Sequence, residues 1–455
     1  MTTIPVRGNP TRGLTTATFA FFAGLTTIVL YGVAGPSFKD SLGLTGGHLG
    51  LMLAAPHLSK SLLRIPFGAW VDQVGGRLPF LILLGLSSLG LIGVATTLLL
   101  TLPDGLDSSY YNLFVLFGVL GGAGGATFSV GVPQTSYWFP RHEQGWALGV
   151  YAGVGNIGPG VFNLLIPVLI ASVGLAAAYS AWAAFMLVAL LVYAATAVDP
   201  YVFQLLRRGH PLEGARDEAR ALGQEVFPSG SALGSLAAAA RLPRTWALVL
   251  LYTVSFGGGF TALTAWFPTY WNEFHHFGMI GAGAMAAVFT VYGSLIRVPG
   301  GSMSDRLGGE VVAVASFLVM ALGSILLAVA SGPALAFLGM MVLGTGMGVA
   351  NAAIFKLVPA YVPSAVGGAS GLIGGIGGLG TIAILPVLGA FTDHYGHIGY
   401  ARGYSVFIVL SLLCAIGAAL LSIRRPPAQE PVTPDAGEAG GTPPASAASA
   451  ARSTS

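Results

Sequence analysis

The sequence predicts an all-α membrane protein with twelve transmembrane helices in two pseudo-symmetric halves of six. Three observations support this prediction: the composition, the number of long apolar runs and an internal repeat. Of the 455 residues, 54% are hydrophobic and only 8% are charged, and the mean hydropathy is +0.77. Soluble domains carry about 25% charged residues, so this composition is typical of a chain that crosses the membrane many times.

The composition also excludes several classes of function. The single cysteine, Cys414, cannot form an intramolecular disulfide, and the sequence has no CxxC motif or Cys/His cluster that would indicate a metal. The formal net charge of +3 is small, and no basic stripe interleaved with aromatic residues indicates nucleic-acid binding. The sequence contains no phosphate-binding loop and no GxSxG nucleophile motif. We therefore expect neither enzymatic activity nor a cofactor.

Twelve apolar runs are long enough to cross the membrane, which takes about 20 mostly apolar residues. Six of them lie near residues 14–35, 49–71, 78–102, 110–138, 145–172 and 174–197. Six more lie near residues 244–272, 279–303, 309–331, 333–361, 365–393 and 401–423. These runs define an N-terminal six-helix half at 14–197 and a C-terminal six-helix half at 244–424.

The segments outside the two halves differ in composition. Residues 1–13 form a short tail with Arg7 and Arg12. The apolar run after them is longer than the core of a typical signal peptide, so we predict a retained first span. Residues 198–243 concentrate charge in RRGHPLEGARDEARALGQ, which predicts a cytoplasmic linker with an amphipathic helix. Residues 425–455 are rich in Pro, Ala and Ser and are predicted to be a disordered cytoplasmic tail.

The distribution of lysine and arginine predicts the orientation in the membrane, because cytoplasmic loops carry an excess of both. With the N-terminus inside, fourteen of the twenty fall on the cytoplasmic side, among them Arg77, Arg141, Arg207, Arg208, Arg306, Arg424 and Arg425. Only Lys39 and Arg402 fall outside. We therefore predict a multi-pass protein of the inner cell membrane with both termini in the cytoplasm.

The internal repeat joins two stretches that each close the second span of a half. RIPFGAWVDQVGG begins at Arg64 and RVPGGSMSDRLGG begins at Arg297, an offset of 233 residues. The offset pairs Gly68 with Gly301, Asp72 with Asp305 and Gly76 with Gly309. A parallel repeat of two six-span halves resembles the major facilitator superfamily, in which the substrate site lies at the midplane between the halves.

The loop GAWVDQVGGR (68–77) resembles the loop motif that this superfamily carries after its second span. The resemblance implies a gating role for Gly68, Asp72 and Arg77, in which the Asp and the Arg help to latch the two halves on the cytoplasmic side. Gly301 and Asp305 are the corresponding residues of the second half. The alternative for Asp72 and Arg77 is an ordinary turn with solvated charges.

Arg64 and Arg297 require an explanation of their own, since an arginine at mid-bilayer depth costs roughly 2.5–3.5 kcal/mol on insertion scales. All seventeen Asp and Glu fall in loops, tails or span ends, so a mobile anion is the economical counter-charge. Guanidinium stays charged and offers a fixed fork of donors that suits a planar oxyanion. The two arginines hold equivalent places in the two halves, which predicts an anion clamp. The alternative is that each arginine bonds backbone carbonyls or extends to the membrane surface.

Two Gly-rich segments narrow the resemblance further. QGWALGVYAGVGNIG and GGASGLIGGIGGLG lie in the fifth and eleventh predicted spans, and the spacing S-x-W-F-P-x-x-x-Q-G-x-A-L-G covers residues 136–149. In these features the chain resembles the nitrate/nitrite porter (NarK-type) family of the superfamily, over nearly all of residues 15–424. The resemblance implies a secondary transporter that moves nitrate, nitrite or both by alternating access between the two halves.

The resemblance also implies the residues of the site. It assigns the anion clamp to Arg64 and Arg297, an aromatic sandwich around the planar anion to Phe128 and Phe256, and polar contacts to Asn156 and Tyr252. Ordinary packing is the alternative for the two phenylalanines, since the chain contains 25 of them. Further candidates, each of which could instead bond a neighbouring helix, are Tyr151 and Asn351.

The sequence leaves the driving force open between nitrate/nitrite exchange and proton/nitrate symport. Symport requires a group that titrates, and Lys356 in AIFKLVP is the leading candidate, because burial can change the protonation of a lysine. His57 and Lys60 lie on one helix face with Arg64, at spacings of three and seven residues, and are further candidates. For Lys60 and Lys356 the alternative is a structural bond. Glu273, His275 and His276 sit at the outer end of the seventh span, and a loop role is expected for both histidines.

Two other functions remain open at this stage. The same fold could carry another small anion, such as an organic carboxylate, because fold alone does not determine the substrate. The chain could also be a membrane sensor of nitrate that transports poorly. The superfamily's usual form is a monomer, and the resemblance implies the same here.

Overall fold

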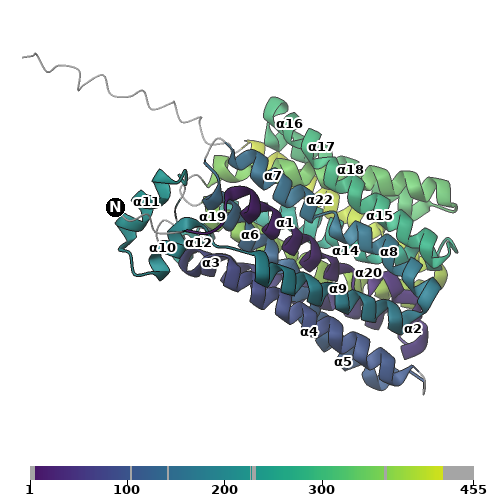
Figure 1. Cartoon of the computed structure of the whole chain (residues 1–455). Helices are drawn as coiled ribbons and strands as arrows, with labels where there is room; N and C mark the ends of the chain where they lie inside the picture. Colours follow the sequence, from purple (N-terminus) through teal and green to yellow (C-terminus); the bar gives the residue numbers. More distant parts are fainter. Residues whose placement is uncertain are drawn as a thin grey trace, which may run out of the picture.

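The computed structural model describes residues 6–102, 105–140, 143–225, 227, 232–362 and 366–423. Within these ranges the regular structure is helical, and no strand occurs. The predicted disordered tail at 425–455 lies outside the described residues. Figure 1 shows the long helices side by side in one bundle, with three short helices gathered at one end: α10 (Tyr201–Arg207), α11 (Leu212–Ala221) and α12 (Ala232–Ala240).

The first half of the chain forms six predicted spans, several of them made of two helices. Helices satisfy their own backbone hydrogen bonds, which the membrane interior requires. The elements are α1 (Pro10–Thr26) with α2 (Gly35–Leu42), α3 (Gly46–Val74), α4 (Arg77–Thr101), α5 (Tyr111–Gly122) with α6 (Thr127–Trp138), α7 (Gln144–Gly155) with α8 (Gly158–Val173), and α9 (Leu175–Thr196).

The second half repeats this arrangement. Its elements are α13 (Pro243–Tyr252), a π-helix (Thr253–Thr261) and α14 (Ala262–Glu273), then α15 (Met279–Leu295) with α16 (Arg297–Leu307), α17 (Gly309–Val329), α18 (Pro333–Tyr361), α19 (Val366–Gly378) with α20 (Gly380–Tyr395), the short α21 (Gly399–Arg402), and α22 (Ser405–Ile423).

The number of spans agrees with the predicted fold class. Ten helical segments in the described part of the chain are long and apolar enough to cross a membrane. A bent pair, Pro10–Val29 and Gly32–Leu42, meets at 41° and makes an eleventh. The twelfth predicted span is α3, a helix of 29 residues that contains His57, Lys60 and Arg64. The chain is a multi-pass membrane protein.

The first span differs from its predicted bounds of 14–35. Its helix begins earlier, at Pro10, because the Asn9 side chain caps it by accepting a hydrogen bond from the Arg12 N–H at 2.8 Å. Helical structure then continues through two 3₁₀ turns into α2 and ends at Gly43, whose φ of 59° is left-handed. The helical structure therefore includes polar residues at both ends of the span, and these cannot be predicted from the apolar run alone.

Several of the predicted spans are interrupted along their length. A 3₁₀ turn at Ala123–Ala126 separates α5 from α6, Asn156 and Ile157 separate α7 from α8, and Ile296 separates α15 from α16. A π-helix replaces α-helix at Thr253–Thr261. Most of these breaks are rich in glycine, which adopts irregular conformations at low cost. Interrupted helices free backbone groups at membrane depth, as transport sites require.

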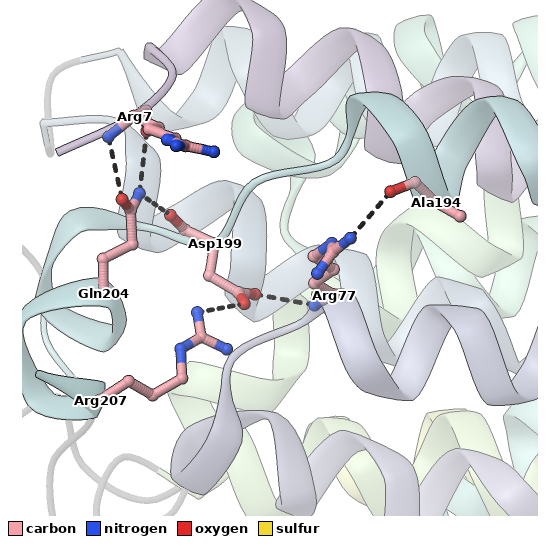
Figure 2. A network of polar contacts seen from close by, with 6 residues as sticks. All are labelled: Arg7, Arg77, Ala194, Asp199, Gln204 and Arg207. Atoms are coloured by element: carbon pink, nitrogen blue, oxygen red, sulfur yellow. Dashed lines mark hydrogen bonds and ion pairs between the residues drawn. The ribbon is translucent and has the colours of Figure 1, made fainter.

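Asp199 ties the loop after the second span to the end of the sixth. It is 1% exposed, its side chain accepts the Arg77 backbone N–H at 2.8 Å, and it pairs with Arg207 at 2.6 Å (Figure 2). Gly75 next to this loop has a φ of +81°, and a Cβ there would lie 2.6 Å from the Asp199 carboxylate. Glycine at position 75 is therefore required by both the backbone and the buried carboxylate.

The same network reaches the N-terminal tail. The Gln204 side chain donates to the carbonyls of Arg7 at 2.8 Å and of Asp199 at 2.6 Å, and it accepts the Arg7 N–H at 2.9 Å (Figure 2). The Arg77 guanidinium donates to the carbonyl of Ala194 at 2.8 Å. In this structure Arg77 therefore contacts its own half, and a latch between the halves remains a prediction. The side chains of Asp72 and Asp305 lie outside the described residues.

Candidate functional site

A small internal cavity lies between the two halves of the bundle. Spans one, two and five of the first half and spans seven and eight of the second enclose it. It is lined by Leu25, Ile28, Lys60, Arg64, Asn156 and Pro159 on one side and by Phe256, Phe260, Thr261, Thr264 and Thr290 on the other. The second half therefore contributes only apolar or neutral side chains to the lining, while the first half contributes two cationic side chains, Lys60 and Arg64.

Arg64 points from α3 to this cavity and is only 6% exposed. Its guanidinium carbon lies 5.2 Å from the centre of the Phe128 ring. One Nη donates to the carbonyl of Gly374, on α19 of the other half, at 3.3 Å, while Nε is buried without a hydrogen-bond partner. Among the described residues no ion pair includes Arg64. A buried cation with spare donors is what an anion site requires.

Arg297 occupies the equivalent place in the second half, at the break between α15 and α16. It is half-buried, and its guanidinium carbon lies 5.7 Å from the centre of the Phe256 ring. Arg297 interacts with the Tyr252 hydroxyl, and Tyr252 also interacts electrostatically with Arg64. The two arginines therefore converge on one aromatic side chain, although Arg297 is not among the residues that line the cavity.

A phenylalanine and a tyrosine lie beside each of the two arginines, although the two pairs come from non-equivalent spans. In the first half Phe128 stacks on Tyr151, with ring centres 6.3 Å apart and an angle of 24°. In the second half Phe256 stacks on Tyr252, with ring centres 4.8 Å apart and an angle of 17°. Each arginine thus lies against a phenylalanine that is itself backed by a tyrosine, which gives cation–π stabilisation on both sides.

The remaining predicted polar residues divide between the cavity and its support. Asn156 lines the cavity at the break between α7 and α8, and its side chain donates to the carbonyl of Ala152 at 2.7 Å. Tyr151 donates to the carbonyl of Thr127 at 2.8 Å. Asn351 on α18 accepts from the Ser255 hydroxyl at 2.9 Å. Tyr151 and Asn351 therefore bond neighbouring helices, as the sequence analysis allowed.

The expectation that Lys356 is buried is wrong. Its side chain is exposed on α18. The buried lysine is instead Lys60, which is 1% exposed and lines the cavity one turn before Arg64. Its Nζ lies 3.0 Å from Nδ1 of His57, which is fully buried. His57 and Lys60 are thus in contact, Lys60 and Arg64 line one cavity, and a role of His57 and Lys60 in coupling stays a prediction.

The candidates at the C-terminal end of the seventh span are grouped away from the cavity. His275 lies beside Tyr270, whose hydroxyl is 3.1 Å from its Nε2. The rings of His276 and His397 stack 5.5 Å apart. Burial, reinforced by His397 and His276, lowers the pKa of His275. These residues belong to a cluster of loop side chains outside the cavity.

The structure also identifies residues that the sequence analysis missed. Thr261, Thr264 and Thr290 line the cavity, and the fully buried Asn163 donates to the carbonyl of Thr264 across the two halves at 3.2 Å. Threonine is common in transmembrane helices, so the sequence alone could not distinguish these three threonines from others as cavity residues. Asn163 is comparable to Asn156 as a buried amide in an apolar span and could have been selected by that criterion.

Comparison with known proteins agrees with this fold. Residues 16–358 and 280–454 match the model of the Major Facilitator Superfamily, and the chain belongs to that superfamily. Among solved structures, the xylose transporter XylE from E. coli in a partially occluded inward-open conformation matches with a TM-score of 0.70 and 16% identity, covering 92% of this chain and 98% of its own. The nucleoside transporter NupG matches with a TM-score of 0.68 and 15% identity, covering 91% and 100%. These structures share the fold.

Relatives at higher identity place the chain within the nitrate/nitrite porter family. The probable nitrate/nitrite antiporter NarK1 of Thermus thermophilus is 30% identical over 388 residues, which is 80% of this chain and 81% of the relative. The probable nitrate/nitrite transporter NarK2 of Mycobacterium tuberculosis is 29% identical over 90% of this chain and 94% of its own. The nitrite extrusion protein of Bacillus subtilis is 30% identical over 79% and 82%. The prediction of a transporter family rather than an enzyme family is confirmed.

Proposed function

We propose that this protein transports nitrate, nitrite or both across the inner membrane by alternating access, and that Arg64 and Arg297 hold the anion between the two halves. The observation that carries the proposal is the symmetric pair of arginines, each stacked on a phenylalanine, beside a cavity with no described carboxylate among its lining residues. Two relatives are named as a probable nitrate/nitrite antiporter and a probable nitrate/nitrite transporter, and these names support the choice of substrate.

The chemistry of the site suits a small planar anion. A guanidinium group offers two parallel N–H donors in its plane, which match two oxygens of nitrate or nitrite. The flat aromatic rings of Phe128 and Phe256 restrict the anion to a slot, and Asn156 and the threonine hydroxyls supply neutral donors. The bound anion also supplies the negative charge that the described lining residues of the cavity do not provide.

Alternating access requires contacts between the halves that open and close. On the outer side, Asp393 of α20 accepts the backbone N–H groups of Gly46 and Gly47 at the start of α3, the latter at 2.8 Å. A Cβ at Gly46 would lie 2.5 Å from the carbonyl of Gly389, and one at Gly389 would lie 2.0 Å from the carbonyl of Gly46. The carboxylate also lies at the positive end of the α3 dipole. We infer that this contact closes the outer side and breaks in the outward-facing state.

We expect Asp393→Asn to increase access to the cavity from outside. The amide keeps one acceptor but loses its charge. A hydrogen bond to a charged group contributes about 1.5–3 kcal/mol and one to a neutral group about 1 kcal/mol, so the substitution costs about 1 kcal/mol, equivalent to roughly a fivefold change in the closed-to-open ratio. The measurement is the rate at which a membrane-impermeant maleimide modifies Thr264→Cys from the outer side. Asp40→Asn, at an exposed outer carboxylate, is the matched control. Equal rates in all three proteins would contradict a latch at Asp393.

Flux measurements in proteoliposomes test the proposed function. We expect nitrate uptake by the purified protein, measured with and without internal nitrite and with and without an inward proton gradient. Uptake that requires internal nitrite and ignores the gradient indicates exchange, whereas uptake into empty vesicles that follows the gradient indicates symport. Failure to move nitrate or nitrite under every condition, with active transport of an organic carboxylate, would contradict the proposed substrate.

A further inference from the structure

Two buried titratable side chains beside the anion site have no role in the clamp itself. Lys60 and His57 are 1% and 0% exposed, lie one turn apart on α3 and are joined by a 3.0 Å contact between Nζ and Nδ1. Lys60 lines the same cavity as Arg64. Gly125 makes room for the lysine stem, because a Cβ at that glycine would lie 2.6 Å from the Lys60 Cγ. The first half is therefore built to hold a lysine at this depth.

The hydrogen bond limits how many protons the pair can hold. An ammonium group has donors only, and a doubly protonated imidazole also has donors only. A hydrogen bond between Nζ and Nδ1 therefore needs a lone pair on one of the two nitrogens. In this geometry the pair carries at most one proton beyond its neutral form, and two protons would make the nitrogens repel each other.

Arg64 is the charged group that faces the pair. Lys60 interacts electrostatically with Arg64, and His57 with Lys60 and Arg64. The elements around the pair contribute neutral groups to the cavity, namely Leu25, Ile28, Asn156, Pro159, Phe256, Phe260, Thr261, Thr264 and Thr290. In an empty site the extra proton is therefore opposed by burial and by Arg64, and no described carboxylate of the cavity lining compensates it.

An anion at Arg64 reverses this balance. The anion places a negative charge next to Lys60. The protonated His57–Lys60 pair is then attracted by the anion instead of being only repelled by Arg64. We propose that the His57–Lys60 pair takes up one proton when the anion binds and releases it when the anion leaves. This proposal rests on the proposed function and assigns its coupling site. One proton and one monovalent anion then cross together, and the loaded carrier has the same net charge as the empty one.

The test compares proton and nitrate movement in proteoliposomes that contain a pH-sensitive dye. We expect the wild-type protein to move about one proton per nitrate into empty vesicles, as the balance of charge in the proposed step requires. In Lys60→Met we expect nitrate entry into empty vesicles without proton movement, or no such entry, while exchange of nitrate for internal nitrite continues. Retained exchange shows that the variant is folded and binds the anion.

A second variant and a matched control separate the pair from a structural role. His57→Asn removes the ring that shares the proton, and we expect the pH at which uptake is half-maximal to shift to lower values, which a mere packing defect would not cause. Lys356→Met, at the exposed lysine of the second half, is expected to keep the wild-type proton ratio. Proton-coupled uptake that survives in Lys60→Met, or that is lost in Lys356→Met instead, would overturn the assignment.

The two proposals fail in different ways. If the wild-type protein moves nitrate without protons, the coupling site is overturned and nitrate transport remains. If it moves neither nitrate nor nitrite, the proposed function itself is wrong.

Discussion

Arg64→Lys is expected to abolish measurable nitrate transport while the protein still reaches the membrane. Lysine keeps the positive charge, but it cannot donate two parallel hydrogen bonds and it loses the flat contact with Phe128 at 5.2 Å. A hydrogen bond to a charged group contributes about 1.5–3 kcal/mol, so the loss of one such bond weakens anion binding roughly 10- to 100-fold. The arginine is also buried, which gives a lysine at this site no access to water.

Arg297→Lys is expected to change transport in the same direction, because Arg297 lies against Phe256 and interacts with Tyr252. Its half-buried position allows the shorter ammonium group to retain water, so we expect a loss somewhat smaller than that of Arg64→Lys. Both losses are measured as nitrate uptake per unit of protein in purified vesicles, with the amount in the membrane determined independently.

The matched control for both variants is Arg402→Lys. Arg402 also lies over an aromatic ring, with its guanidinium carbon 4.9 Å from the centre of Tyr395, but it is exposed and outside the cavity. Transport close to that of the wild type is expected there. If Arg64→Lys and Arg297→Lys transport nitrate as well as Arg402→Lys does, the clamp is excluded.

The fold and the arginine pair were accessible from the sequence because each depends on a pattern with a strong physical cause. Long apolar runs follow from the thickness of the membrane, and the constant offset between Arg64 and Arg297 reveals the two halves. The cost of a charge at membrane depth then identifies both arginines as functional candidates. The positions of Arg64 against Phe128 and of Arg297 against Phe256 agree with that interpretation.

Other parts of the site depend on side-chain direction and helix irregularity, which the sequence does not specify. Lys60 and Lys356 occur in similar apolar contexts, yet one is buried and the other exposed, because burial depends on which face of the helix meets the other half. The π-helix at Thr253–Thr261 could not be distinguished from an α-helix by its apolar pattern. It places Phe256 beside the cavity, and π-helical turns are frequent at functional sites.

The glycines of the second Gly-rich segment have a role that the structure makes explicit. GGASGLIGGIGGLG packs against the π-helix, where a Cβ at Gly257 would lie 2.0 Å from the carbonyl of Gly377. Gly377 in turn faces Tyr252, with 2.8 Å from a Cβ at that glycine to the ring. The close contact therefore determines where Tyr252 and Phe256 stand beside Arg297. The segment therefore acts on the proposed anion site through helix packing.

Gly257→Ala is therefore expected to reduce both stability and transport. The new methyl group would meet a backbone carbonyl, which cannot rotate away, and overpacking of this kind costs about 1–3 kcal/mol. The π-helix must shift away from α19 to relieve the contact, and this shift moves Phe256 from the guanidinium of Arg297. We expect a lower midpoint of thermal unfolding in detergent and at least a roughly tenfold loss of nitrate flux, which corresponds to about 1.4 kcal/mol.

Gly371→Ala supplies the matched control, because it lies in the same Gly-rich segment but is exposed. A Cβ there would come no closer than 3.9 Å to Leu236, which is an ordinary contact. Replacing a helical glycine with alanine favours the helix by about 0.8–1 kcal/mol where space allows, so we expect unchanged or slightly higher stability and normal flux. If Gly257→Ala and Gly371→Ala change thermal stability and nitrate flux equally, the effect of an added methyl group does not depend on its position in the packing. In that case close contact with the π-helix would not be what positions Tyr252 and Phe256.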